Sequence, residues 1–456
     1  MASAKVKFAG NPITEGVIWQ QLLLFFFPIL LGSFFQQMYN TVDAVIVGNF
    51  VGKEALAAVG GTTSALINLL VGFFVGLSSG ATVVLSQHYG ASRNKEVSQT
   101  VSTAFALAIT GGLILTIFGI IFAEDLLRMM NTPDDVMVHA TAYLRIYFVG
   151  VIPAFIYNIG TGILRAIGDS RRPLYFLMIA CVVNIALDLL FVVVMKMGVK
   201  GVGYATVIAQ CVSATLVIIT LTRSNTSYQL IIKKIRFHGN LMRDIVRIGF
   251  PAGMQSMMYA ISNAIVQSTV NGFGTDTVAA WTAMSKLDGM HWMMLQAFGI
   301  AVTTFVAQNI GARKYDRARK SVRTCLGLTT IFTLAITAIM VFFGGSLLRL
   351  FTNDETVLKY GVKIILQMSP YYILYICVEI LSGALRGSGD TLVPLLMTVV
   401  GICGMRIVWI YLVLPHYNTL STLTMCYPIT WAITSLLFIC YYLRGKWFER
   451  AVSKLA

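Results

Sequence analysis

The chain has 456 residues, of which 57% are hydrophobic and only 12% are charged, whereas roughly 25% of residues are charged in an ordinary soluble domain. A soluble protein needs a largely polar surface, so this composition excludes a water-soluble enzyme, a nucleic-acid-binding protein and a disordered chain. The 34 basic residues outnumber the 19 acidic residues, and in a membrane protein such an excess reports orientation.

Apolar runs long enough to cross a bilayer recur along the whole chain, since a transmembrane helix needs about 20 such residues. Short polar breaks, several of them containing Gly or Pro, separate these runs. The sequence therefore predicts an all-α integral membrane protein with twelve transmembrane helices, over residues 17–50, 54–86, 95–123, 136–166, 173–196, 200–222, 241–273, 276–308, 319–343, 356–386, 392–415 and 419–443.

Basic residues are concentrated at both termini and in the connections that follow every second segment. Arg165 and Arg386 are counted among these connections, because each lies at the end of a predicted segment. Loops rich in Lys and Arg stay on the cytoplasmic side, so the pattern predicts that both termini are cytoplasmic. The seven cysteines show no Cys-x-x-Cys spacing, which predicts neither disulfides nor a zinc site.

The two halves of the chain resemble each other. LRAIGDSRRPL from Leu164 matches LRGSGDTLVPL from Leu385, an offset of 221 residues. FPILLGSFFQQMYNTVDAVIVG also matches FPAGMQSMMYAISNAIVQSTV, and SQHYGASRNK matches AQNIGARKYD. Each half holds an even number of segments, so the halves are predicted to be parallel repeats. We expect an N-terminal six-helix lobe over residues 1–222, a cytoplasmic linker over 223–239 and a C-terminal six-helix lobe over 240–456.

Polar side chains inside the first and fifth segments need an explanation, because an ionisable group at the bilayer centre costs about 2.5–3.5 kcal/mol on insertion scales. Gln36, Asn40 and Asp43 are spaced four and three residues apart, which places them on one helix face. Asn184 and Asp188 are four residues apart and also share a face.

The hydroxyl of Thr206 in the sixth segment completes an oxygen-rich set. Such oxygens serve a hard cation or a proton relay. The carboxylates occur in one half only, since Asp43 aligns with Val266 and Asp188 with Trp409. We therefore interpret Asp43 and Asp188 as ligands of a coupling ion, H⁺ or Na⁺, with no other metal; the alternative is that each merely hydrogen-bonds a neighbouring helix.

The second half carries its own charged residues within the segments: Lys286, Asp288, His291, Glu379 and Arg406. We expect a charge-neutralised structural cluster, in which Lys286 pairs with Glu379 or Arg406 pairs with Asp288. A second coupling or substrate-gating site is the alternative.

Aromatic ring faces attract cations, and Met side chains adapt to varied ligands. The side chains that we expect to line a substrate cavity are Asn40, Met257, Met258, Tyr259, Asn263, Trp281, Trp292 and Glu379.

Several motifs taken together resemble the multidrug and toxic compound extrusion (MATE) family: TVDAVIVGNFVG at the end of the first segment, QHYGASR and QNIGARK, and LRAIGDSRRP and LRGSGD. The resemblance extends from about Pro12 to Arg444. It implies a V-shaped bundle of two lobes in the bacterial inner (plasma) membrane, without a cofactor and functional as a monomer. Entry of H⁺ or Na⁺ would drive the export of small amphipathic, often cationic drugs.

The DinF-like branch of this family resembles the chain most. The resemblance places that branch's N-lobe cation site on Gln36, Asp43, Asn184, Asp188 and Thr206. The NorM-like branch has an acidic residue where Tyr259 stands, so the resemblance does not extend to a C-lobe coupling site.

Three other functions compete with drug export. A flippase for lipids or lipid-linked precursors is expected to have a cationic central cavity, and often two further spans. A major facilitator carrier is expected to have an acidic and basic signature loop, where GASRNK stands here. An integral membrane enzyme needs a catalytic motif, and the sequence has no HExxH, GxSxG or P-loop.

Overall fold

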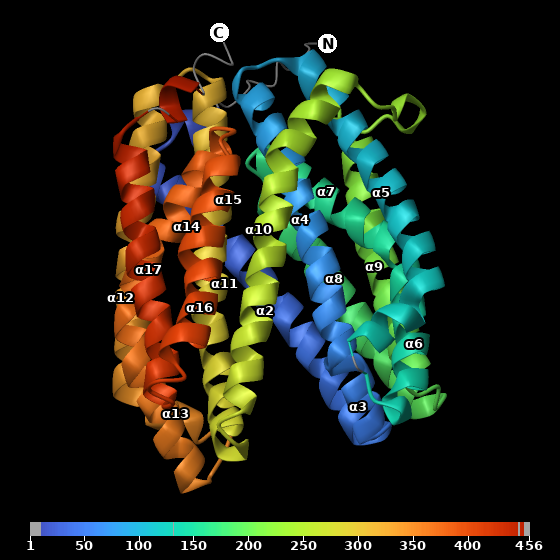
Figure 1. Ribbon diagram of the computed structural model, residues 1–456. Helices are drawn as coiled ribbons and strands as arrows, with labels where there is room; N and C mark the ends of the chain where they lie inside the picture. The colour runs from blue at the N-terminus through green and yellow to red at the C-terminus, as the bar shows by residue number, and fades with distance from the viewer. Residues whose placement is uncertain (1–10, 131, 446, 451–456) are drawn as a thin grey trace.

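The computed structural model describes residues 11–130, 132–445 and 447–450, and all regular structure within these ranges is helical. The short α1 (Pro12–Glu15) and the last turn of α17 (Leu420–Leu443) lie at the same end of the bundle, which we call the terminal end (Figure 1). Residues 1–10 and 451–456, on which the expectation of cytoplasmic termini partly depends, lie outside the described residues.

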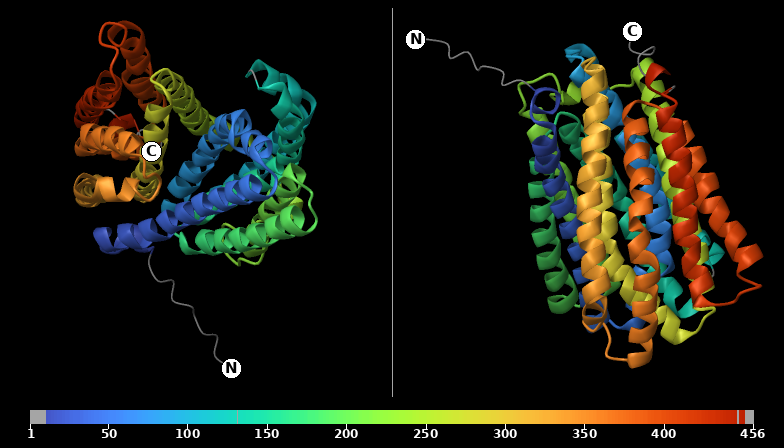
Figure 2. Two further views of the ribbon diagram at one scale, coloured as in Figure 1. Left: turned by 90° about the horizontal axis from the view of Figure 1, so that it is seen from below. Right: turned by 90° about the vertical axis from the view of Figure 1, so that its left-hand side faces the viewer.

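The helices fall into two groups, one from each half of the chain, which approach each other at the terminal end and diverge toward the opposite, far end (Figure 1). A view from the far end shows the blue-to-green group beside the yellow-to-red group (Figure 2). The first group contains α2 (Ile18–Phe50), α3 (Lys53–Gly60), α4 (Thr62–Gly90), α5 (Asn94–Met129), α6 (Asp134–Val149), α7 (Val151–Ala166), α8 (Arg171–Asp188), the π-helix η1 (Leu189–Val194) and α9 (Val199–Thr222).

A linker with one 3-10 turn, η2 (Ile232–Lys234), leads from α9 to the second group. Ser102 on α5 donates a hydrogen bond to a carbonyl oxygen of this linker, at Arg236. The second group contains α10 (Gly239–Asn271), α11 (Thr275–Gly311), α12 (Tyr315–Leu348), α13 (Glu355–Met368), the 3-10 helix η3 (Ser369–Tyr371), α14 (Tyr372–Gly387), α15 (Leu392–Thr398), the π-helices η4 (Val399–Gly404) and η5 (Trp409–Val413) on either side of α16 (Met405–Val408), and α17.

Within the described residues, ten helical stretches are long and apolar enough to cross a membrane, and eleven if α6 and α7, bent by 47°, count as one span. The remaining segment is α10, which has 33 residues but is less apolar, because Gln255, Ser256 and Asn263 face the cavity described below. The twelve predicted segments are thus all helical. Three of them are interrupted where Gly61, Gly150 and Pro370 stand, since Gly is a weak helix former and Pro lacks an amide donor.

Helices α4 and α10 join the two groups through backbone contact. Each carries a Gly-x-x-x-Gly pair, Gly76 and Gly80 on α4 and Gly249 and Gly253 on α10. A Cβ atom on Gly76 would overlap the backbone of Gly253, and one on Gly249 would overlap the backbone of Leu77. Small residues at this spacing are the usual means by which membrane helices approach closely.

Helix α2 also connects the two groups. Its first turns pack in the core of the second half, where Phe26 stacks on Phe298 with ring centroids 3.9 Å apart. Its last turns pack against α3 and α8 of the first half. Pro28 lies within this helix, where its missing amide donor removes one intrahelical hydrogen bond.

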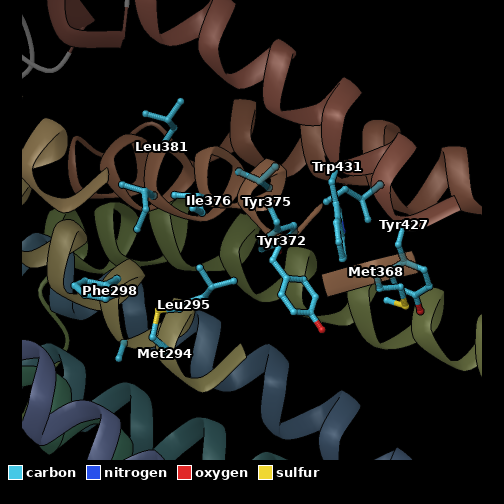
Figure 3. Packing of buried hydrophobic residues seen from close by; sticks show 14 of the residues in the cluster. Met294, Leu295, Phe298, Met368, Tyr372, Tyr375, Ile376, Leu381, Tyr427 and Trp431 are labelled. Carbon is cyan, nitrogen blue, oxygen red and sulfur yellow. The ribbon is translucent and has the colours of Figure 1, made fainter. Parts of the chain in front are cut away.

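The core of the second half is aromatic. Trp431 of α17 contacts Tyr372 and Tyr375 of α14 (Figure 3), with a centroid distance of 5.8 Å between Tyr375 and Trp431, and Tyr427 of α17 contacts Trp431. Packing of large rings makes this group of helices a rigid wall for the space between the lobes.

Candidate functional site

The first half holds a buried cluster of oxygen-bearing side chains near its far end. Asp43 on α2 is 6% exposed, Asn184 and Asp188 on α8 are fully buried, and Thr206 on α9 is 2% exposed. Asp43 and Asp188 interact electrostatically. Four of the five residues proposed from the sequence as an ion site therefore lie within one packed group of three helices.

Gln36, the fifth residue proposed for this site, is exposed. It lies seven residues before Asp43, about 10.5 Å away along α2, so it shares the face but not the depth of the carboxylates. Gln36 and the buried cluster are thus separate features of the same helix face.

Tyrosines surround the cluster, and the sequence analysis did not identify them. Tyr39 lies within hydrogen-bonding reach of Thr206 and interacts electrostatically with Asp43, and Tyr143 on α6 also interacts with both carboxylates. The position of Tyr39, four residues before Asp43, is a sequence signal that could have indicated it. Tyr143 carries no such signal, because helix packing alone brings it near.

Several polar atoms of this cluster lack partners. Among the described residues, Oδ1 of Asp43, both carboxyl oxygens of Asp188 and both amide atoms of Asn184 make no hydrogen bond of good geometry. Thr206 Oγ1 donates to the carbonyl oxygen of Val202 at 2.9 Å. Buried polar atoms are normally paired, so an unpaired group of this size requires an explanation.

The π-helix η1 begins directly after Asp188, at Leu189. A π-helical turn adds a residue to the turn and leaves backbone groups less regularly paired, and such turns are frequent at functional sites. The second half has its counterpart in η5, which begins at Trp409, the residue aligned with Asp188.

A cavity of about 700 Å³ lies between the two groups of helices. Its walls come from α4 and α7 of the first half and from α10, α11, α14 and α17 of the second, with Met368 from α13 and Arg406 from α16. A cavity of this size accommodates a drug-sized ligand.

Tyr259, Asn263, Trp281 and Glu379 line this cavity, as does Trp292. Asn40, Met257 and Met258 are not among the lining residues. Met257 is two residues from both Gln255 and Tyr259, which line the cavity. Two residues correspond to about 200° of rotation, so Met257 lies on roughly the opposite side of α10 from these two side chains. Asn40 is exposed on α2, and α2 contributes no lining residue.

Arg165 and Arg386 also line the cavity. The sequence analysis assigned both to polar connections, and this assignment was wrong. Each stands one residue before the last residue of its helix, α7 or α14, but the side chain reaches back into the space between the lobes. With Arg406, Asp288 and Glu379, the lining then holds three basic and two acidic side chains.

The expected charge pairs of the second half are not formed. Among the described residues, no ion pair joins Lys286 to Glu379 or Arg406 to Asp288. Lys286 is exposed, whereas the Glu379 carboxyl group lies against Gly299, 13 residues and about 20 Å further along α11.

Asp288 and Arg406 instead contact uncharged side chains. Asp288 accepts a hydrogen bond from Trp292 Nε1 at 2.6 Å. Arg406 donates to Asn263 Oδ1 at 3.1 Å, and its guanidinium lies 4.2 Å from the ring centroid of Tyr427. His291 is buried and stacks on Tyr372 at 4.1 Å. The cluster is therefore held by hydrogen bonds and ring contacts, not by charge neutralisation.

Reciprocal hydrogen bonds close the cavity at the terminal end. Gln87 on α4 donates to the carbonyl oxygen of Gly387 at 3.0 Å, and Gln308 on α11 donates to that of Ala166 at 2.5 Å. The two donors are 221 residues apart, as are the two acceptors, so the repeat produces the same contact twice. Asn11, next to α1, also donates to Gln308 at 2.9 Å.

Comparison with known proteins gives one family. The family model MatE matches residues 28–190 and 251–412. The chain is 29% identical over 447 residues to "Probable multidrug resistance protein YoeA" of Bacillus subtilis, with 96% of each chain covered. It is 28% identical over 394 residues to "Probable multidrug resistance protein YpnP" of the same organism, covering 86% of this chain and 88% of that one.

Solved structures share the fold. One, described as the outward-facing conformation of a multidrug resistance MATE family transporter of the MOP superfamily, superposes with a TM-score of 0.88 at 20% identity, covering 98% of each chain.

Proposed function

Since the chain belongs to the MatE family of membrane transporters, we propose that it exports small amphipathic drugs in exchange for H⁺ or Na⁺ taken up at Asp43 and Asp188. The names of the two Bacillus subtilis relatives support the multidrug substrate class. The ion-coupled mechanism rests on this chain's own residues.

The observation that carries the proposal is the buried, unpaired carboxyl pair. Two ionised carboxylates at this depth would repel each other, and each would lose its hydration. A proton shared between them, or a sodium ion that also binds the oxygens of Asn184 and Thr206, removes both costs. Occupancy of the site therefore favours close approach of α2 to α8.

Helix α2 transmits this movement to the cavity. Asp43 lies in its last third, and Phe25 and Phe26 near its start are packed in the core of the second half. Phe25 contacts Phe305 and Phe26 contacts Phe298, both on α11. A shift of α2 toward α8 must therefore displace α11, which lines the cavity, or bend α2 near Pro28.

The conformation described here suits the step that releases drug outward. The terminal end is closed by the reciprocal glutamine contacts, the helix groups diverge at the far end (Figure 1), and the fold matches a transporter described as outward-facing. With the terminal end cytoplasmic, as the basic connections predict, the cavity opens away from the cytoplasm. Ion uptake in this state would then drive return of the transporter.

The test is efflux of ethidium from proteoliposomes under an imposed pH gradient or an imposed Na⁺ gradient. We expect one gradient to drive efflux in the wild type, and Asp43→Asn and Asp188→Asn each to abolish it. Asp276→Asn is the matched control, because it removes an exposed carboxylate at the start of α11. Gradient-driven efflux at the wild-type rate in Asp43→Asn would refute the proposed ion site.

One observation favours a second candidate, a flippase for lipids or lipid-linked precursors. Arg165, Arg386 and Arg406 in the cavity lining are the kind of side chains that bind an anionic head group. Asp288 and Glu379 in the same lining favour drug export, since they attract cationic groups. Translocation of a lipid without efflux of dye under either gradient would favour the flippase.

A further inference from the structure

The end of the cavity nearest the terminal end is built from repeat-related residues. Thr82 and Thr303, 221 residues apart, both line it, and so do Arg165 and Arg386. Asn158 and Glu379 form a third pair at the same spacing and also line the cavity. The two halves therefore present the same side chains to the cavity at two of these three pairs, and they differ at the third.

Because Asn158 is neutral and Glu379 is acidic, the surroundings of Arg165 and Arg386 differ in charge. Residues seven apart on a helix share a face. Glu379 precedes Arg386 by seven residues and interacts with it electrostatically. Asn158 precedes Arg165 by the same seven residues and carries no charge. The positive charge of Arg386 is thus partly offset within its own helix, whereas that of Arg165 is not.

The acidic residue nearest to Arg165 in the sequence does not pair with it. The acidic residue nearest in sequence, Asp169, pairs with Arg172 at 3.2 Å. Among the described residues, Arg165 forms no ion pair, and its buried Nε has no hydrogen-bond partner. The Arg165 side chain lines the cavity, and a guanidinium in such a place is suited to a carboxylate or phosphate, which it binds through two parallel hydrogen bonds.

We infer that Arg165 forms an anion-binding subsite at the closed end of the cavity, and that the transported molecules include amphiphiles carrying a carboxylate or phosphate group. This inference rests on the proposed transport function and specifies its substrate class. The apolar body of the substrate lies along Tyr259 and Trp292, which line the cavity on the second half. A cationic group on the same molecule would find Asp288 or Glu379, so zwitterions fit the whole cavity.

The test compares two dyes that differ only in the anionic group, rhodamine B and its ethyl ester, by fluorescence anisotropy with the full-length protein in nanodiscs. We expect the wild type to bind rhodamine B more tightly than the ester. Arg165→Gln should reduce this preference about tenfold or more, because it removes a charge-assisted contact. Arg386→Gln should reduce it less, because Glu379 already offsets that charge.

Asn158→Glu tests the inference without removing the arginine. The new carboxylate would stand where Glu379 stands in the other half and should lower the preference for rhodamine B more than Asn158→Gln does. Lys286→Gln is the control for loss of one positive charge, since Lys286 is exposed and does not line the cavity. Size-exclusion profiles and thermal unfolding establish that each variant is folded.

Equal affinity of the wild type for both dyes, or an unchanged preference in Arg165→Gln, overturns the subsite. If the protein prefers rhodamine B in a way that depends on Arg165 and yet shows no gradient-driven efflux, that result supports the subsite and refutes only the ion coupling. Translocation of fluorescent phosphatidylglycerol in liposomes, assayed beside rhodamine B, identifies the source of the anion. Loss of lipid translocation in Arg165→Gln identifies a lipid head group, and loss of rhodamine B binding alone identifies a free amphiphile.

Discussion

The reciprocal glutamine contacts at the terminal end lead to a testable prediction about alternating access. Gln87 and Gln308 hold opposite halves of the chain together, through Gly387 and Ala166 respectively. These hydrogen bonds exist only while the lobes are closed at this end. Replacing both glutamines by alanine should therefore shift the transporter toward the state that is open at the terminal end.

The size of the shift follows from the bonds removed. Two bonds join the lobes directly, and a third joins Asn11 to Gln308. A neutral hydrogen bond contributes about 0.5–1.5 kcal/mol, so the three together contribute about 1.5–4.5 kcal/mol to the closed state. Every 1.4 kcal/mol changes the ratio of two states tenfold, so we expect the closed-to-open ratio to fall by at least about tenfold.

Pulsed electron spin resonance measures this directly. Spin labels at Lys95 and Lys320, both exposed at the terminal end on different halves, report the distance between the lobes in a cysteine-free background. The double variant should gain a population with a longer distance. Gln367→Ala is the matched control, because its partner Thr424 lies in the same half. An unchanged distance distribution in the double variant would show that the glutamines do not hold the closed state.

Two further predictions concern stability. Gly76→Ala should lower the free energy of unfolding by about 1–3 kcal/mol, measured by thermal unfolding in detergent, because its Cβ overlaps the backbone of α10. Gly72→Ala, one turn away, should have little effect, since its Cβ meets the Ser256 side chain at 3.6 Å, and equal losses would contradict the close crossing. Arg317→Met should speed amide hydrogen exchange across α1, because Arg317 donates to the carbonyl oxygen of Ile13 at 3.0 and 3.1 Å; unchanged exchange would mean that other contacts hold α1.

The sequence was informative about features that the energetics of the membrane restrict, namely the length of the helices and the burial of charged side chains. Apolar length predicted the helical segments, because a membrane span has a minimum length. The cost of burying charge made Asp43 and Asp188 conspicuous, and helix periodicity joined Asn184 to them. The structure brings these three residues together, although their binding of an ion stays a prediction.

The sequence was less informative about the space between lobes. Whether Arg165 faces solvent or a cavity depends on how the helix groups tilt, and neither periodicity nor composition encodes that tilt. The same holds for Lys286 and Arg406, whose expected partners Glu379 and Asp288 lie on other helices. To predict which charged residues pair, one must know how far neighbouring helices are shifted along their axes relative to each other. An error of two turns in this shift moves two side chains too far apart to form an ion pair.

The two halves of the chain keep the same residue at some repeat-related positions and differ at others, according to the role of each position. The terminal-end contact needs a donor and an acceptor from each half, and Gln87 and Gln308 are both present. The proposed ion site needs one copy only, and Val266 stands where Asp43 would recur. In the second half Arg406, hydrogen-bonded to Asn263, places a permanent positive charge in the corresponding region. If only the first half takes up an ion, as we propose, the movement can reach the second half only through an element that both halves share. Helix α2 is such an element, since it runs from Asp43 to the core of the second half.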